Sequence, residues 1–430
     1  MNSTPEKNNA KWRWSLTATC VLLLFTSFRN LDNQLVAILN ANLVSVPTLL
    51  GNESQDDLKK LQAVFTSVDS KVIAIGEQSH GTSEFFEVRK KLIKLFSSDP
   101  KLSKIGLEAP MAEVEDLNGY VLDGRGDLKS ILKSFRLYNY ECAEFVDLVN
   151  QVQEINKNRK TKITFFGFDI QSPFRSLEKI REFAKEDTSI PVESISKLLS
   201  DYTLLNNQVY SHNFSREDFD SLKYISQPLL SGVFTSTKNG LSIRDYQTNY
   251  RQFLLLNDPS VTNYEMSIMS ELRDSLMAVN VLNQITSNSK MIILAHNAHV
   301  QKTTSVYSKS MGYFLKRNLK NNYKVIGQTT SSGTVTAFKP SIGKISADNL
   351  LASPDQTSFE YYFSLTQKPV FLIQTTRIAG LIKPGERPKK YRLLPFGIPN
   401  DQYVTGDAIE DFDYIVHIEK TSGNKSFYLN

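Results

Sequence analysis

The sequence is poor in cysteine, and this scarcity excludes a fold held together by disulfides. Only Cys20 and Cys142 occur among the 430 residues, and Cys20 lies inside an apolar run near the N-terminus. Beyond that run the chain has one cysteine, so it forms no internal disulfide. The place of Cys20 inside the run, rather than after it, also argues against a lipid attachment site. The stability of the fold must therefore come from a packed hydrophobic core.

Charge of one sign is not in excess either. The chain has 50 Lys and Arg residues and 45 Asp and Glu residues, which leaves a net charge of +5. No stripe of basic residues is interleaved with aromatics, so we expect no nucleic-acid partner. Apolar residues make up 40% and charged residues 22%, and we find no internal repeat and no low-complexity segment. This composition is typical of a globular protein with one large domain or two modest ones.

Long hydrophobic runs are missing, with one short exception near the N-terminus. Residues 14–28 are uncharged and largely apolar, and Lys7, Lys11 and Arg13 precede them. A charged segment followed by a short apolar run is typical of an export signal, and this run is too short for a comfortable spanning helix. We therefore expect residues 1–29 to be a signal peptide or signal anchor of a periplasmic or extracellular protein. The end of the run offers no clear cleavage site, so membrane attachment through residues 14–28 is the alternative to removal.

Short apolar runs and amphipathic stretches alternate along the rest of the chain. Residues 30–55 are polar and weakly patterned, and we interpret them as a linker. The runs that we expect to form strands cover 72–75, 104–109, 163–168, 291–294, 323–328, 369–374 and 414–418. Strands that alternate with helices predict an α/β fold with a mostly parallel sheet covered on both sides. Within a domain spanning 56–430, the long helical stretches of about 175–285 predict a helical insertion.

Four of the expected strands end in titratable side chains. These side chains are Glu77 and His80, Glu108, Asp169, and the pair His296 and His299. Because the carboxyl ends of parallel strands meet at one edge of a sheet, where ligands bind, we expect a single pocket there. Three of the five histidines occupy these positions, whereas His212 and His417 have no such setting. Each residue alone has a plainer explanation, since a glutamate after a strand can cap a helix and a His-Asn-x-His run can satisfy loop backbone.

The helix expected after the first strand carries one charged residue on its apolar side. On a helical wheel, Arg89 falls within the arc of Phe85, Leu92 and Ile93. A buried guanidinium is costly unless a carboxylate answers it, so we expect acids to approach from another part of the fold. Glu108 and Asp169 are the candidates. The alternative is a structural ion pair beneath the helix.

These groups together suggest hydrolysis by an activated water molecule. His80, near the positive end of the following helix, would act as a general base, and Glu77 would orient its imidazole. Arg89, His296 or His299 would then stabilise the oxyanion that develops on the attacked carbonyl. A nucleophile elbow of the Gly-x-Ser-x-Gly type is absent, so nothing in the sequence favours a covalent serine mechanism.

A further helix, expected over residues 270–286, carries a polar stripe. Arg273, Met277 and Asn280 lie along it, beside an apolar stripe that includes Leu272. The periodicity is equally typical of an exposed polar face and of a helix that turns functional groups inward.

Six motifs follow one another in an order that resembles the erythromycin esterase family, from about residue 70 to 420. They are Gly76-Glu77-Gln78-Ser79-His80-Gly81, Glu84-Phe85-Phe86 with Arg89, Gly106-Leu107-Glu108-Ala109, Gly167-Phe168-Asp169, Arg273-Asp274 with Met277-Ala278 and Asn280, and Ala295-His296-Asn297-x-His299. The resemblance implies an α/β three-layer fold with a helical insertion. It also implies hydrolysis of a macrolide lactone, a small-molecule substrate, by water activated at His80.

The resemblance also implies which residues form the site. The catalytic positions would be His80, Glu77, Arg89, Glu108, His296 and His299, and the supporting or substrate-binding positions would be Asp169, Arg273, Asn280 and Asn297. A metal is not generally required in this family. Its known resistance enzymes act inside the cell, whereas the N-terminus here predicts export, so the natural substrate is not implied by membership.

Two other functions stay open at the level of the sequence. Three histidines and several carboxylates could hold zinc or a related divalent metal, which would make the protein a metallohydrolase, for example a peptidase. The third reading is an exported protein without enzymatic activity that binds haem or iron. The cluster of acids around a buried arginine suits charge development in a reaction better than it suits an apolar porphyrin slot.

Overall fold

The computed structural model describes most of the chain beyond the N-terminal segment. The described residues are 32–51, 55–65, 69–205, 214–234, 237–238, 241–262, 266–304, 308–394, 397–399 and 401–429. The expected signal peptide or anchor, residues 1–29, lies outside these ranges. Within them, no helix has both the length and the apolar character needed to cross a membrane.

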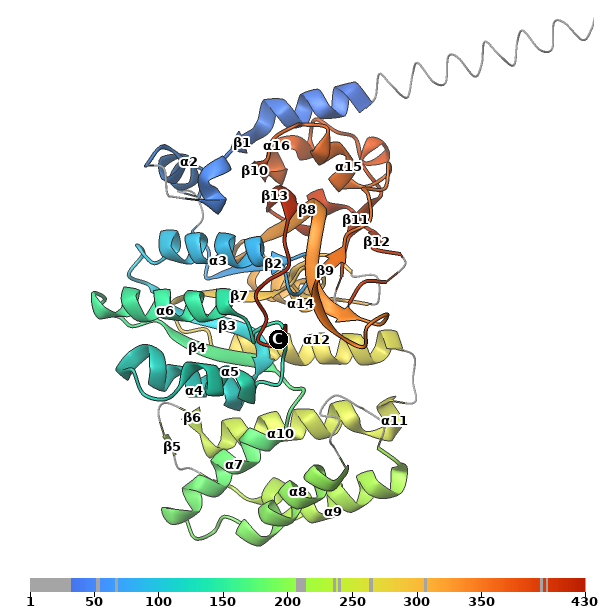
Figure 1. Cartoon of the computed structure of the whole chain (residues 1–430). Coiled ribbons are helices and arrows are strands. Elements are labelled where there is room, and N and C mark those ends of the chain that lie inside the picture. The colour runs from blue at the N-terminus through green and yellow to red at the C-terminus, as the bar shows by residue number, and fades with distance from the viewer. Residues whose placement is uncertain are drawn as a thin grey trace, which may run out of the picture.

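A nine-stranded sheet lies at the centre of the molecule (Figure 1). In sheet order its main path is β1 (Leu43–Ser45), β10 (Val370–Gln374), β13 (Tyr414–Thr421), β8 (Tyr323–Lys339), β2 (Val72–Glu77), β7 (Lys290–His296), β3 (Leu102–Pro110) and β4 (Thr164–Asp169), and β9 (Lys344–Leu350) pairs with β8. The pairings from β13 to β4 are all parallel, whereas β1, β10 and β9 join in antiparallel orientation. The predicted α/β fold with a mostly parallel sheet is therefore confirmed.

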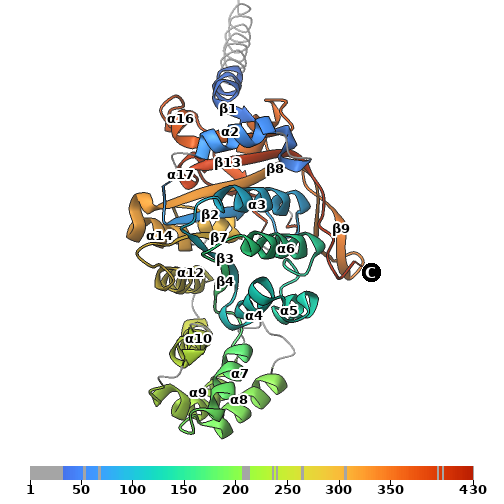
Figure 2. The same ribbon diagram turned by 90° about the vertical axis from the view of Figure 1, so that its left-hand side faces the viewer.

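Helices cover both faces of the sheet, as Figure 2 shows. One face carries α2 (Gln55–Phe65), α3 (Ser83–Phe96), α4 (Met111–Asp123), α5 (Leu128–Ser134) and α6 (Ala143–Lys157). The other face carries a helix over 32–42, α12 (Met266–Asn283), α13 (Asn297–Val300), α14 (Met311–Leu319), α15 (Phe359–Ser364), α16 (Thr375–Ala379) and α17 (Ala408–Asp411). Two short ladders lie outside the main sheet, one between β5 (Thr237–Lys238) and β6 (Leu241–Ser242) and one between β11 (Lys390–Arg392) and β12 (Tyr403–Thr405).

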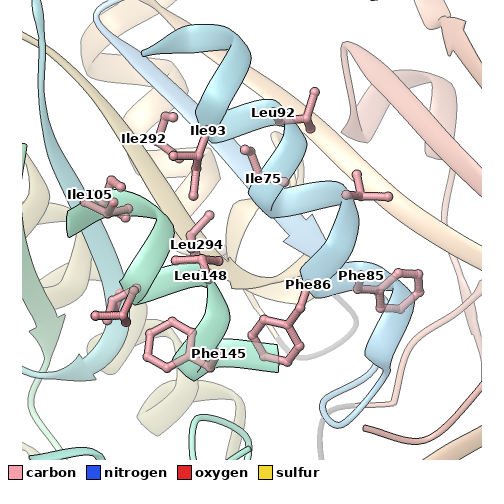
Figure 3. Close-up of a cluster of buried hydrophobic side chains, with 14 of the residues drawn as sticks. Ile75, Phe85, Phe86, Leu92, Ile93, Ile105, Phe145, Leu148, Ile292 and Leu294 are labelled. Carbon is pink, nitrogen blue, oxygen red and sulfur yellow. The ribbon is translucent and has the colours of Figure 1, made fainter. Parts of the chain in front are cut away.

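The central strands are apolar on both faces because each face meets a layer of helices. In β2, Ile73 and Ile75 enter the cluster beneath α3 and α6, whereas Val72 and Ala74 enter the cluster on the opposite face. This alternation follows from the two-residue period of a strand. Each fully buried Ile or Leu side chain contributes about 1.5–3 kcal/mol. Figure 3 shows part of the first cluster, with Ile75, Phe85, Phe86, Leu92, Ile93, Ile105, Phe145, Leu148, Ile292 and Leu294.

The free edge of β4 is closed by asparagine side chains from neighbouring helices. Asn156 of α6 accepts a hydrogen bond from the backbone N–H of Ile163 at 2.7 Å and donates to its carbonyl at 2.9 Å. Asn118 of α4 makes the same pair of bonds with Phe165, at 2.7 and 2.9 Å. A primary amide presents one donor and one acceptor side by side, so it replaces the missing neighbour strand. The edge is thereby protected from pairing with another chain.

Part of the segment expected as a linker is built into the fold. Residues 32–42 are helical, and Leu35 and Leu39 enter the cluster beneath α15 and α16. Residues 43–45 form β1, which pairs with β10. The polar appearance of this segment arises because a surface helix and a three-residue edge strand each bury only one side.

The helices between β4 and β7 divide into two groups. α7 (Phe174–Glu182), α8 (Val192–Leu205), α9 (Arg216–Ser231) and α10 (Ile243–Asn257) share a core of their own, and the short α11 (Pro259–Thr262) leads to α12. Figure 1 places this helical unit at the end of the molecule away from α16. The last helix of the predicted insertion, α12, instead covers the sheet, since Met277, Ala278 and Val281 enter the cluster on its face.

Candidate active site

The first half of the site is the turn that joins β2 to α3. Glu77 is the last residue of β2, and the Nδ1 atom of His80 lies 2.7 Å from its Oε1 atom. The chain then turns at Gly81, whose φ of 84° favours glycine, and whose missing Cβ would lie 2.0 Å from the carbonyl oxygen of Thr336. The close backbone approach at Gly81 therefore holds His80 over the end of the sheet.

Arg89 lies beneath this turn, on the buried side of α3. Its side chain is 1% exposed, and one terminal nitrogen donates to Glu77 Oε2 at 2.7 Å. The other donates to the carbonyls of Ala295 and Ile75, at 2.9 and 3.3 Å. The prediction that Arg89 is buried is confirmed, but the prediction of its partners is wrong. The partner is Glu77, whereas Glu108 and Asp169 approach a different arginine.

Arg273 of α12 is the arginine that pairs with the carboxylates of Glu108 and Asp169. Its guanidinium donates to both oxygens of Asp169, at 3.0 and 2.6 Å, and more distantly to Glu108 at 3.4 Å. The polar stripe of α12 therefore turns inward, and the alternative of an exposed polar face is wrong. Leu272 on the adjoining stripe is only half-buried.

His299 stands between two acids of this second half. Its Nδ1 atom lies 2.6 Å from Asp274 Oδ1, and its Nε2 atom lies 3.3 Å from Glu108 Oε1. Burial alone would lower the pKa of His299, but the charges of Asp274 and Glu108 more than offset it, so the pKa is raised. His299 therefore holds its proton to higher pH than an ordinary histidine does.

Glu108 connects the two halves. Burial alone would raise its pKa, but His299, His80 and Arg273 lower it further than burial raises it, so the pKa lies well below the ordinary value. Its Oε2 atom also accepts the backbone N–H of His296 at 2.8 Å. Glu108 is consequently an anion that both Arg273 and His299 approach.

His296 is bound by backbone on both ring nitrogens. Its Nδ1 atom accepts the N–H of Ala298 at 3.2 Å, and its Nε2 atom donates to the carbonyl of Gln78 at 2.9 Å. Burial, together with the neighbouring His80, holds the pKa of His296 well below its usual range. The ring centroids of His80 and His296 are 5.2 Å apart. This neutral imidazole holds the turn between β2 and α3 in place, and neither of its ring nitrogens is left to bind a substrate.

The side chains of Asn280 and Asn297 form hydrogen bonds with backbone carbonyls inside the protein. Asn280 donates to the carbonyl of Phe168 at 3.0 Å, and Asn297 donates to the carbonyl of Gln328 at 2.9 Å. Both side chains are buried. They hold the ends of the strands in place and do not face the reacting groups.

Two residues that orient the site, Asp274 and Gln78, occur in the sequence motifs, but the sequence analysis gave neither of them a role. Asp274 follows Arg273 directly and shares the buried stripe of α12, which is the signal that could have found it. Gln78 lies between the two acting residues of the turn, and its side chain donates to Glu360 at 3.0 Å. Nothing local in the sequence announces that bond, because 282 positions separate the two residues.

Exposure separates the residues that can meet a substrate from those that hold them. The side chains of His80, His299 and Arg273 are 11%, 13% and 15% exposed, whereas those of Glu77 and Arg89 are at most 3% exposed. A substrate would therefore meet two imidazoles and one guanidinium. The carboxylates lie behind them and set their charge and direction.

The donor set does not fit a divalent metal. Among the residues that the structure describes, no three His, Cys, Asp or Glu side chains are grouped as metal ligands. Both nitrogens of His296 are bound to backbone, and an Arg273 nitrogen lies 3.2 Å from His299 Nε2, where its charge opposes a cation.

Comparisons with known proteins show which proteins this chain resembles. The family model described as erythromycin esterase matches residues 103–421. Erythromycin esterase type II from Escherichia coli is 26% identical over 420 residues, which cover 88% of this chain and 95% of that protein.

Two solved structures share the fold. A protein from Bacillus cereus superposes with a TM-score of 0.71 at 22% identity, covering 92% of this chain and 99% of that one. A mutant of the erythromycin esterase EreC in its open conformation superposes with a TM-score of 0.69 at 17% identity, covering 90% and 99%.

Proposed function

This chain belongs to the erythromycin esterase family, and we propose that it hydrolyses a carboxylic ester or lactone with water activated at His80. The observation that carries the proposal is the double engagement of Glu77. One carboxylate oxygen takes a hydrogen bond from Arg89 and the other meets Nδ1 of His80. An ionised carboxylate only accepts hydrogen bonds, so Nδ1 of His80 must carry the proton. The lone pair is then on Nε2, which is the atom that would take a proton from water.

Arg273 and His299 supply the positive charge that the reaction requires. As the water oxygen bonds to the carbonyl carbon, negative charge develops on the carbonyl oxygen, and the cationic side chains stabilise it. The bond from the carbonyl carbon to the alkoxy oxygen then breaks. His299 donates a proton to the leaving alkoxide, and His80 retains the proton taken from water. An ester thereby gives an acid and an alcohol, a lactone gives one hydroxy acid, and proton exchange with solvent restores both imidazoles.

The charge balance of the site favours a substrate whose reacting group is neutral. Each cation is already faced by a carboxylate, Arg89 by Glu77, Arg273 by Asp169, and His299 by Asp274. A phosphate or sulfate ester would bring further negative charge to a site in which each of these cations already has a carboxylate partner. Carboxylic esters and lactones bring none. The name of the Escherichia coli relative specifies erythromycin, a macrolide, which makes macrolide lactones the first compounds to test.

A hydrolysis screen of the full chain tests this function. The panel contains macrolides, simple lactones and aryl carboxylic esters, with aryl phosphates as the matched comparison, each with and without chelator. By mass spectrometry, we expect macrolides and lactones to gain one water and aryl esters to split into a carboxylic acid and a phenol, at rates that the chelator leaves unchanged. Aryl phosphates should stay intact. Turnover of phosphates alone, or activity that only added metal restores, would contradict the proposal.

Changing Asp274 to Asn should shift the pH dependence of activity. Asp274 raises the pKa of His299, so the protonated form persists below that raised pKa and is lost as the pH rises through it. Without the carboxylate, the alkaline limb of the pH profile of kcat should move to lower pH. At alkaline pH, kcat should fall by roughly tenfold or more, which is part of the roughly 10²–10⁴-fold that a positioned general acid contributes. Glu271→Gln, on the same helix and paired with Lys309, is the control. An unshifted alkaline limb in Asp274→Asn would remove His299 from the role of acid.

A further inference from the structure

We propose that the end of the molecule formed by the helix over 32–42 and by α16 rests against an anionic membrane surface. The chain between the N-terminal apolar run and the described fold is short. The apolar run of residues 14–28 ends only four peptide steps before residue 32, where the described fold begins. Four residues span at most about 14 Å when fully extended. A bilayer that receives this run must therefore lie close to the surface around residue 32.

The surface around residue 32 is fixed by packing against α15 and α16. The hydroxyl of Tyr362 donates to Asp32 Oδ1 at 2.8 Å. Leu35 belongs to the same buried cluster as Ile378 and Ile382, which lie in and just after α16. Figures 1 and 2 both show the helix over 32–42 beside α16 at one end of the molecule. Residue 32, where the described fold begins, and α16 therefore belong to one surface.

This surface combines an exposed leucine with cations. Leu381 is 54% exposed two residues after α16, and Arg377 within α16 is exposed as well. The side chain of Lys383 is 82% exposed, with Glu386 as a distant partner at 3.5 Å. An apolar side chain flanked by basic groups suits the boundary between lipid headgroups and acyl chains. Cations Lys7, Lys11 and Arg13 on the far side of the run extend the same preference for anionic lipid.

Docking in this orientation leaves the active site open to the aqueous phase. The contact surface lies at the β1–β10 edge of the sheet, and β13 and β8 separate it from β2, which carries Glu77. The helical unit from α7 to α10 lies at the opposite end of the molecule (Figure 1). Membrane contact at this surface is therefore independent of the proposed esterase activity, and substitutions there should leave turnover of soluble substrates unchanged.

A fluorescent label at the contact surface tests the proposal. In the full chain with Cys20→Ser, the cysteine of Leu381→Cys carries an environment-sensitive dye, since Cys142 is buried. Leu255→Cys, 46% exposed on α10 at the far end, is the matched control. With vesicles of phosphatidylcholine and phosphatidylglycerol, the dye at position 381 should shift to the blue and be quenched by headgroup quenchers. The dye at position 255 should not respond.

A pair of charge reversals tests the electrostatic part. Arg377→Glu with Lys383→Glu should weaken the transfer of the dye at 381 by roughly 25-fold or more, at about fivefold for each cation lost. Lys197→Glu with Lys223→Glu makes the same change of net charge in α8 and α9 and should have no effect. Three results would overturn the proposal: a dye at 381 that stays in water while the chain sediments with vesicles, equal effects of the two double variants, or a shift caused by self-association without vesicles.

Discussion

Replacing His80 with Gln should lower kcat for ester hydrolysis by roughly 10³-fold, within the 10²–10⁴-fold that general base catalysis contributes. A glutamine amide can still donate to Glu77, so the turn keeps its hydrogen bond, but its nitrogen has no lone pair to accept a proton from water. KM should change little, because the lost interaction exists only in the transition state. Initial rates on the best substrate of the screen measure both parameters.

Glu77→Gln provides the companion measurement. It removes the carboxylate that holds the proton on Nδ1 of His80, and it should reduce kcat without the base itself being touched. Glu87→Gln is its matched control. Glu87 lies near the start of α3, but its carboxylate forms an ion pair with Lys90 instead of a contact with His80. Near-wild-type turnover in His80→Gln would end the assignment of His80 as the base, whatever the activity of the control.

Replacing Arg89 with Met should destabilise the protein by about 3–5 kcal/mol, the cost of leaving a buried carboxylate without its cation. Both side chains of the pair are nearly inaccessible, so water cannot replace the guanidinium at Glu77. The midpoint of urea unfolding should fall while its slope stays the same. Lys94→Met, on the exposed side of the same helix, should change stability by less than about 0.5 kcal/mol.

The double variant Glu77→Gln with Arg89→Met separates stability from catalysis. Removing both charges eliminates the unpaired carboxylate, so part of the lost stability should return. Activity should not return, because the carboxylate that orients His80 is still missing. A single Arg89→Met variant as stable as the parent would show that Glu77 is not held by this pair, and a double variant with restored turnover would show that the pair has only a structural role.

The sequence alone predicted a large part of the fold and the membership of the site. The runs around β2, β3, β4 and β7 were recognisable because a parallel strand buried on both faces is apolar at every position. The burial of Arg89 was predictable because helical periodicity is local. The second half of β8 and all of β9 were missed. Residues 329–339 contain few large apolar side chains, and their strand conformation depends on pairing with β13 over 329–333 and with β9 over 334–339.

The pairings within the site were a different matter. The sequence placed Glu108 and Asp169 beside Arg89, and the structure places them beside Arg273. A strand end and a helix stripe each reveal that a charge is buried, but not which charge it meets. That depends on where α12 crosses the end of β4, 104 positions from Asp169 to Arg273.

What the chain itself determined was local: which side chains are turned inward, and which of them follow strands at one edge of a sheet. Only the tertiary structure decided that Glu77 serves Arg89 and His80 together, that Asp274 governs His299, and that both nitrogens of His296 are bound by backbone. The physical reason is that burial follows from the periodicity of neighbouring residues, whereas an ion pair or a hydrogen bond requires two atoms to meet within about 3 Å. Packing of distant segments sets that distance, and periodicity carries no information about it.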